Sequence, residues 1–138
     1  MSSELVAERW HDVQREVASA ASEAGRDAGE ITTVVVTKFH PAELVRELAA
    51  AGVIDVGENR HQEAAAKAAE CVDLALRWHF VGQLQSKKAR QAAQYASVIH
   101  SLDRESLVTA LAGVESPPSV FVQVNLTDDP GRGGVAPP

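Results

Sequence analysis

Short runs of β-branched and other apolar residues alternate along this chain with stretches whose apolar residues are spaced as in an amphipathic helix. The runs predict strands at residues 31–37, 53–56, 77–81, 97–100 and 119–126. The other stretches predict helices at residues 3–24, 41–51, 59–71, 86–95 and 103–112. Regular alternation of strand and helix favours an α/β fold with a parallel sheet and right-handed crossovers. Two architectures remain open, the doubly wound sheet and the closed eight-stranded barrel.

The length of the chain limits the second of these architectures. Its 138 residues fit one domain and supply only five predicted strands. A closed barrel of this type needs eight strands and typically about 250 residues. Residues 127–138 have the composition of a loop, and no predicted helix follows them. We therefore expect the chain to be a fragment that stops within a loop.

Charge and cysteine content exclude several classes of protein. A net charge of −6 gives no general attraction to nucleic acid or to anionic membrane surfaces. The single cysteine, Cys71, cannot form an internal disulfide, and no basic start followed by an apolar segment suggests secretion. The five histidines are scattered without metal-ligand spacing. We expect a cytoplasmic protein with no metal, no nucleic-acid partner and no membrane partner.

Lys38 directly follows the first predicted strand, where a strand of a parallel sheet opens onto a loop. Side chains alternate along a strand, so Val36 and Lys38 share one face. Lysine is rarely buried without a task, and an amine that loses hydration there has more free base with which to attack a carbonyl carbon. The residues alone leave two interpretations open: a lysine that forms a Schiff base, and a solvated lysine that ends the strand.

Further polar residues are predicted at the carboxyl ends of the strands, where parallel α/β proteins bind ligands. Asn59 follows the second strand, His79 lies in the third, and Gln123 and Asn125 share one face of the last. We expect these residues and Lys38 to converge on one rim.

Ordinary structural roles compete with these assignments. Asn59 is also a suitable N-cap for the next helix, and a histidine in the position of His79 is often a hydrogen-bonded core residue. Glu58 and Glu63 are expected to be first-turn acids that complement the helix dipole, without a chemical role.

Five segments, in order, closely resemble the pyridoxal phosphate homeostasis proteins. They are VVTK at 35–38, VGENRHQE at 56–63, WHFVGQLQSKK at 78–88, IHSLD at 99–103 and QVNL at 123–126. The resemblance covers nearly all of this chain but only about the first half of a typical member. It implies the N-terminal part of a (β/α)8 TIM barrel of the alanine racemase type, spanning residues 1–138 with an opening helix at 3–24 and a loop-like tail at 127–138.

The resemblance also implies a cofactor and a site. Family members bind pyridoxal 5'-phosphate (PLP) through an imine to a lysine at the end of the first strand, which Lys38 matches. Asn59 and His79 match positions near the cofactor, whereas the phosphate is held mainly by the second half of the barrel. We rate contact of Gln123 and Asn125 with the ligand as an open question.

Three functions remain possible at this point. The first is a non-catalytic carrier that delivers PLP to apoenzymes, as a full-length protein that is a monomer or weak dimer. The second is a racemase-like enzyme, which needs a second base opposite the lysine. In alanine racemase a tyrosine from another domain supplies it, whereas Tyr95 here falls on a predicted outer helix. The third is an inactive fragment.

Overall fold

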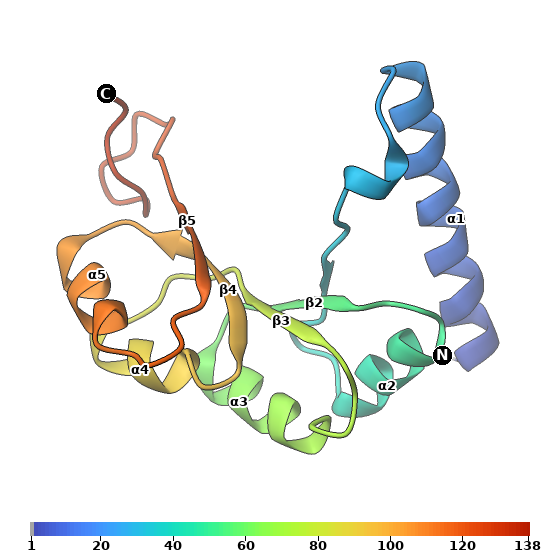
Figure 1. Cartoon of the computed structure of the whole chain (residues 1–138), viewed down its shortest axis with the longest axis horizontal. Coiled ribbons are helices and arrows are strands. Elements are labelled where there is room, and N and C mark those ends of the chain that lie inside the picture. Colours follow the sequence, from blue (N-terminus) through green and yellow to red (C-terminus); the bar gives the residue numbers. More distant parts are fainter. Residues whose placement is uncertain (1) are drawn as a thin grey trace.

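The computed structural model describes residues 2–138, in which five strands alternate with helices (Figure 1). The strands are β1 (Val35–Val36), β2 (Asp55–Glu58), β3 (Arg77–Phe80), β4 (Ala96–Leu102) and β5 (Ser119–Val122). The α-helices are α1 (Ser3–Glu23), α2 (Ala42–Ala50), α3 (His61–Glu70), α4 (Ala89–Ala92) and α5 (Glu105–Ala112). Two short 3-10 helices, η1 (Ala28–Glu30) and η2 (Ser86–Lys88), precede β1 and α4.

Within residues 2–138 the strands form one parallel sheet in the order β1-β2-β3-β4-β5. Each strand therefore pairs with the strand that precedes it along the chain. A doubly wound sheet reverses its strand order at a switch point, whereas a (β/α) barrel keeps sequential order. The topology confirms the parallel α/β prediction and selects the barrel-like alternative.

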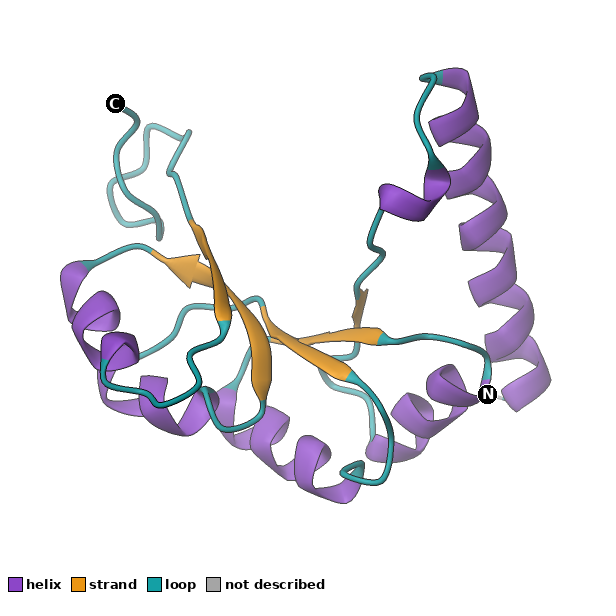
Figure 2. Ribbon diagram, viewed as in Figure 1, coloured by secondary structure: helices purple, strands orange, loops and turns teal. Residues whose placement is uncertain are grey.

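Helices α2 to α5 all lie along one face of the sheet, and the opposite face has no helix over it in this view (Figure 2). Alternation along the strands turns Val56, Trp78 and Phe80 toward the helices, where they are buried. The buried side chains form two clusters, one around β2, α1 and α2 and one around β4, α4 and α5. The hydrophobic core thus lies between the sheet and its helical layer.

Two glycines end helices as the sequence predicts. Gly25 follows α1 with φ 68° and Gly52 follows α2 with φ 105°. Both angles lie in the left-handed region, which glycine adopts without the steric penalty that a Cβ brings.

The outer strands are shorter than predicted. Of residues 31–37, only Val35–Val36 form β1, although the Thr37 N–H also donates to the Gly57 carbonyl at 2.8 Å. The predicted strand 119–126 ends at Val122, beyond which Val124 forms an isolated bridge with Val135. Both strands lie at an edge of the sheet, and a periodic sequence pattern does not report how many neighbours a strand will have. The predicted helix 86–95 is also interrupted, since η2 precedes a single turn, α4.

Apolar side chains are exposed where the sheet lacks cover. Val36 is 47% exposed, and Phe121 and Val122 on β5 are more exposed still. Separately, none of the helices in the described part of the chain is both long enough and apolar enough to cross a bilayer.

Candidate functional site

Lys38 lies in a four-residue turn that begins where β1 ends. The Thr37 carbonyl accepts a hydrogen bond from the His40 N–H at 3.1 Å, which places Lys38 and Phe39 at the two central positions. Phe39 has φ 68°, an uncommon value for a bulky residue but the sign that the third position of a type II turn requires. The Lys38 Nζ lies 5.7 Å from the centroid of the Phe39 ring, and the Arg60 guanidinium lies 5.5 Å from it. Phe39 therefore links the lysine turn to the segment after β2.

Lys38 is exposed, so the expectation that its amine loses hydration is wrong for this chain. The physical reason is that Lys38 lies in the turn beyond β1, in which Phe39 and His40 are exposed as well. The amine is thus accessible to a dissolved aldehyde. Its assignment as the cofactor lysine stays a prediction.

Asn59 lies one residue before the N-cap of α3, which is Arg60, so the prediction that Asn59 caps this helix is wrong. Its Oδ1 atom is buried and has no hydrogen-bond partner in residues 2–138. Gly82, two residues after the end of β3, packs so closely that a Cβ there would lie 2.8 Å from the Asn59 Cβ. Asn59 also borders a surface cavity of about 390 Å³, together with Gln83 and Lys88. A buried acceptor without a partner is uncommon in folded proteins, so the Asn59 Oδ1 is a group that a further donor would satisfy.

His79 belongs to a hydrogen-bonded network on the face of the sheet opposite the helices. Its Nε2 lies 2.8 Å from the Asp55 Oδ1, and its Nδ1 lies 2.9 Å from the His100 Nε2. Asp55 also accepts two hydrogen bonds from Arg77, each of 2.9 Å. The ring of Phe121 packs against His100 with centroids 5.0 Å apart. The structure therefore gives His79 the contacts of a hydrogen-bonded interior histidine, and its contact with a cofactor stays a prediction.

The charge state of this network follows from its surroundings. Burial raises the pKa of Asp55, but hydrogen bonds from Arg77 and His79 together lower it by more than burial raises it. The pKa of Asp55 therefore lies below its ordinary value. Burial, and secondarily the proximity of His79, lowers the pKa of His100. We accordingly assign Asp55 as a carboxylate and His100 as a neutral ring. The His79 Nε2–H then donates to the Asp55 Oδ1, and one N–H lies between the His79 Nδ1 and the His100 Nε2.

Gln123 and Asn125 lie beyond the end of β5 rather than within it. The Gln83 amide donates to the Gln123 Oε1 at 3.1 Å. The Asn125 amide donates to the Asp129 carbonyl at 2.9 Å, while its oxygen accepts from the Thr127 N–H at 2.9 Å. Asn125 thus organises its own loop. Among the five predicted site residues, Lys38 is connected to the segment after Asn59, because Lys38 and Arg60 both lie near the Phe39 ring. His79 hydrogen-bonds Asp55 and His100, and Asn125 hydrogen-bonds residues of its own loop.

Sequence reasoning missed Glu58 and Lys67. Glu63 does lie in the first turn of α3, but Glu58 is the last residue of β2 and is 1% exposed, so its assignment as a first-turn acid is wrong. Its partner is Lys67, which is also buried. A signal for Lys67 exists in the sequence, since it lies three residues after Ala64 and four before Cys71, on one face of the helix. Across residues 2–138 no group of three or more His, Cys, Asp or Glu side chains could hold a metal ion.

A parallel sheet in sequential order, with helices on one face and polar groups after its strands, defines the class of (β/α) barrel-like proteins. A protein from Bifidobacterium adolescentis with a solved structure has the same fold, with a TM-score of 0.83 at 24% identity over 96% of this chain and 60% of its own. PipY of Synechococcus elongatus, whose crystal structure has PLP bound, gives a TM-score of 0.73 at 35% identity over 94% of this chain and 57% of PipY.

A curated relative gives the family. The pyridoxal phosphate homeostasis protein of Pseudomonas aeruginosa is 41% identical over 137 residues, which covers 96% of this chain and 59% of the relative. No protein-family model matches the chain. The chain belongs to the pyridoxal phosphate homeostasis protein family, which confirms the resemblance of the five segments, and it spans less than two thirds of the length of the relatives it matches.

Proposed function

We propose that the chain binds PLP as an imine on Lys38 and that the protein stores and delivers this cofactor. The observation that carries the proposal is the bound PLP in PipY, which is 35% identical over most of this chain. The exposed amine of Lys38 at the end of β1 supports it, because an aldehyde can reach the nitrogen from solvent.

Covalent attachment here needs no oxidant or reductant. Bound PLP supplies an aldehyde. The unprotonated Lys38 nitrogen bonds to the aldehyde carbon, and the aldehyde oxygen leaves as water with the two amine hydrogens. The attachment is reversible by the addition of water, which suits a carrier that must release its cargo.

Other residues of the chain support binding in this proposal. The unpartnered Asn59 Oδ1 offers an acceptor to a donor of the bound molecule. His79, oriented by Asp55 and His100, is assigned to the proposed site beside the ring. Gln123 and Asn125, each held by hydrogen bonds beyond the end of β5, are assigned in this proposal to contacts with the bound molecule.

A carrier is favoured over a racemase-like enzyme because Tyr95, the one tyrosine of this sequence, is engaged within the helical layer. Tyr95 hydrogen-bonds His61 in the helical layer, with the Tyr95 hydroxyl 3.0 Å from the His61 Nδ1. Burial also raises the pKa of Tyr95, which disfavours the phenolate that a base requires. The proposal includes a cytoplasmic location, PLP-dependent apoenzymes as recipients, and a full-length protein that is a monomer or weak dimer.

Reductive trapping tests the linkage. The chain is incubated with PLP, reduced with borohydride and mapped by peptide mass spectrometry. We expect label on Lys38, loss of that label in Lys38→Ala, and its retention in the control Lys87→Ala, which removes an exposed lysine on η2. Equal labelling of Lys38, Lys67, Lys87 and Lys88 would exclude a specific site. Turnover in amino-acid racemase assays would contradict the carrier.

A further inference from the structure

We propose that the buried ion pair of Glu58 and Lys67 positions Lys38 for imine formation by fixing Thr37, the residue that precedes it. This inference rests on the proposed function of Lys38 and adds two positioning residues to it. Neither residue touches the aldehyde in this proposal, since both act through the backbone at Thr37.

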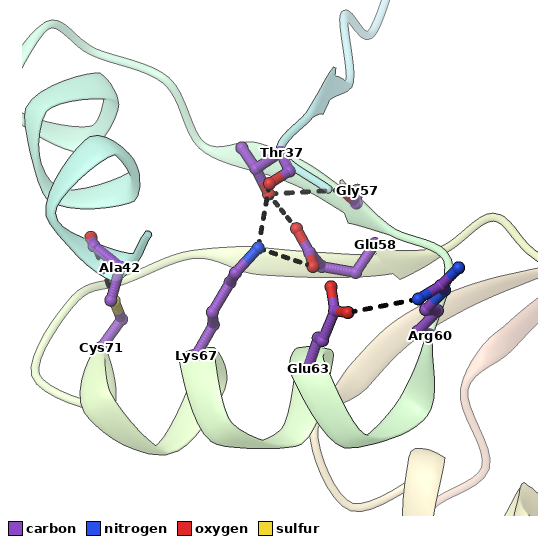
Figure 3. A network of polar contacts seen from close by, with 8 residues as sticks. All are labelled: Thr37, Ala42, Gly57, Glu58, Arg60, Glu63, Lys67 and Cys71. Atoms are coloured by element: carbon purple, nitrogen blue, oxygen red, sulfur yellow. Dashed lines mark hydrogen bonds and ion pairs between the residues drawn. The ribbon is translucent and has the colours of Figure 1, made fainter. Parts of the chain in front are cut away.

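The contacts of Thr37 carry the inference (Figure 3). The Lys67 Nζ lies between two acceptors, donating to the Thr37 carbonyl at 2.9 Å and to the Glu58 Oε1 at 2.9 Å. The Thr37 hydroxyl donates to the other oxygen of Glu58, Oε2. The Thr37 N–H donates to the Gly57 carbonyl at 2.8 Å. The amide hydrogen, the carbonyl and the side chain of Thr37 are therefore all held by β2 and α3.

Burial makes these contacts depend on one another. Thr37 and Glu58 are each 1% exposed, and Lys67 is 8% exposed. A charge removed from water is tolerated only when it is paired and hydrogen-bonded, so the ammonium and the carboxylate each require the partners they have. A buried ion pair is often no more stabilising than apolar side chains of the same size, whereas it does impose a definite geometry.

That geometry is transmitted to the lysine turn. The Thr37 carbonyl accepts from Lys67 and, at 3.1 Å, from the His40 N–H that closes the turn around Lys38. The orientation of the peptide between Thr37 and Lys38 is therefore set from both sides. Phe39 holds a positive φ in the same turn, a conformation that persists only where the surroundings enforce it. An ion pair that only held α3 against β2 would need no more than Glu58 and Lys67. Here Lys67 also donates to the Thr37 carbonyl, which is next to Lys38.

Positioning of this kind is expected to act on rate and selectivity. A lysine whose backbone is fixed presents its amine to a bound aldehyde in a narrow range of positions, and small displacements of a reacting group are costly. Lys87 and Lys88 lie on η2, outside this network, and serve as internal references for unassisted labelling.

The test compares variants of the network in PLP trapping. The double variant Glu58→Gln/Lys67→Met removes both charges and leaves neither one unpaired, whereas Glu70→Gln is the control on an exposed position of the same helix. We expect trapping at Lys38 to slow by about tenfold or more in the double variant, with unchanged trapping at Lys87 and Lys88. Lys67→Arg, which keeps a charged donor, should recover part of the rate. Circular dichroism and urea unfolding establish that each variant is folded.

The outcomes separate this inference from the proposed function. If the parent chain shows no preference for Lys38, the proposed function fails. If PLP labels Lys38 selectively in the parent chain and at the same rate in the folded double variant, the positioning role of Glu58 and Lys67 is overturned. The proposed imine on Lys38 then still stands. If the double variant does not fold, Thr37→Val decides, because it keeps the shape and the carbonyl of Thr37 and removes only the bonds of the hydroxyl to Glu58 and to the Gly57 carbonyl. We expect a several-fold slower rate in Thr37→Val, and an unchanged rate would overturn the proposal.

Discussion

Replacement of Gly82 by alanine is a direct test of the close packing beside Asn59. A Cβ at Gly82 would lie 2.8 Å from the Asn59 Cβ and 2.9 Å from its Cα, and it would approach the Asn59 carbonyl oxygen more closely still. Two of these three atoms belong to the backbone, which cannot swing aside as the end of a long side chain can. The connection between β2 and α3 must therefore move.

The expected cost follows from two opposing effects. Overpacking of this kind typically costs about 1–3 kcal/mol. The loss of glycine restricts the unfolded chain and returns about 0.4–1 kcal/mol. We expect a net loss of about 1–2 kcal/mol in the free energy of unfolding, and a decrease in Tm of about 3–10 °C for a domain of this size.

The assay is urea unfolding of Gly82→Ala and of a matched control, Gly113→Ala. At Gly113 the nearest atom to a new Cβ is the Nη2 of Arg90 at 3.0 Å, the far end of a flexible and exposed side chain. The control should lie within about 0.5 kcal/mol of the parent. Equal stability of Gly82→Ala and the parent, with equal slopes in urea, would refute the reasoning.

Four further predictions concern ionisable side chains. Glu58→Gln and Lys67→Met, each made alone, should lower the free energy of unfolding by about 3–5 kcal/mol, and the double variant should lower it by less than the sum of the two. If each single variant loses less than about 1 kcal/mol in urea unfolding, the ion pair is solvated instead of buried. The lowered pKa of His100 means that the unfolded chain binds the proton first, so stability should fall as pH decreases below about 6.5. The stabilisation from Asp55, whose pKa is also lowered, is complete above about pH 4 and should be lost as pH falls through its folded pKa. The His100 prediction would be contradicted by a urea midpoint that is constant between pH 7 and pH 5. It would also be contradicted if His100→Gln left the dependence of stability on pH unchanged. Burial raises the pKa of the Cys71 thiol, so alkylation should be slow in the native chain and fast in urea, and equal rates would show that the thiol is exposed.

Periodicity in the sequence predicts the elements of this fold because it reports local chemistry. The alternation of strands and helices, the parallel sheet and the helix ends at Gly25 and Gly52 all follow from residues close together in the chain. Strand lengths at the edges do not, because the extent of β1 and β5 depends on neighbours that the pattern of one strand does not specify.

The candidate site shows the same division. The place of Lys38 after β1 was predictable from the run of β-branched residues, but its exposure was not, since this depends on what packs against the turn beyond β1. The pairing of His79 with His100 and Asp55 joins three strands, and the pairing of Glu58 with Lys67 joins a strand to a helix. Such partners become visible only when the register is known, because nothing in the local sequence around one partner names the other.

Sequential strand order bears on how this chain acquires its structure during synthesis. Val56 pairs with Trp78, and Trp78 with Ala96, so each strand meets a neighbour made only about twenty residues earlier. Contacts of such short separation form quickly, and they allow each strand and its helix to dock as they leave the ribosome. The earliest units then serve as the template for the later ones, so a substitution that disorders β2 should impair folding more than an equally costly one in β5.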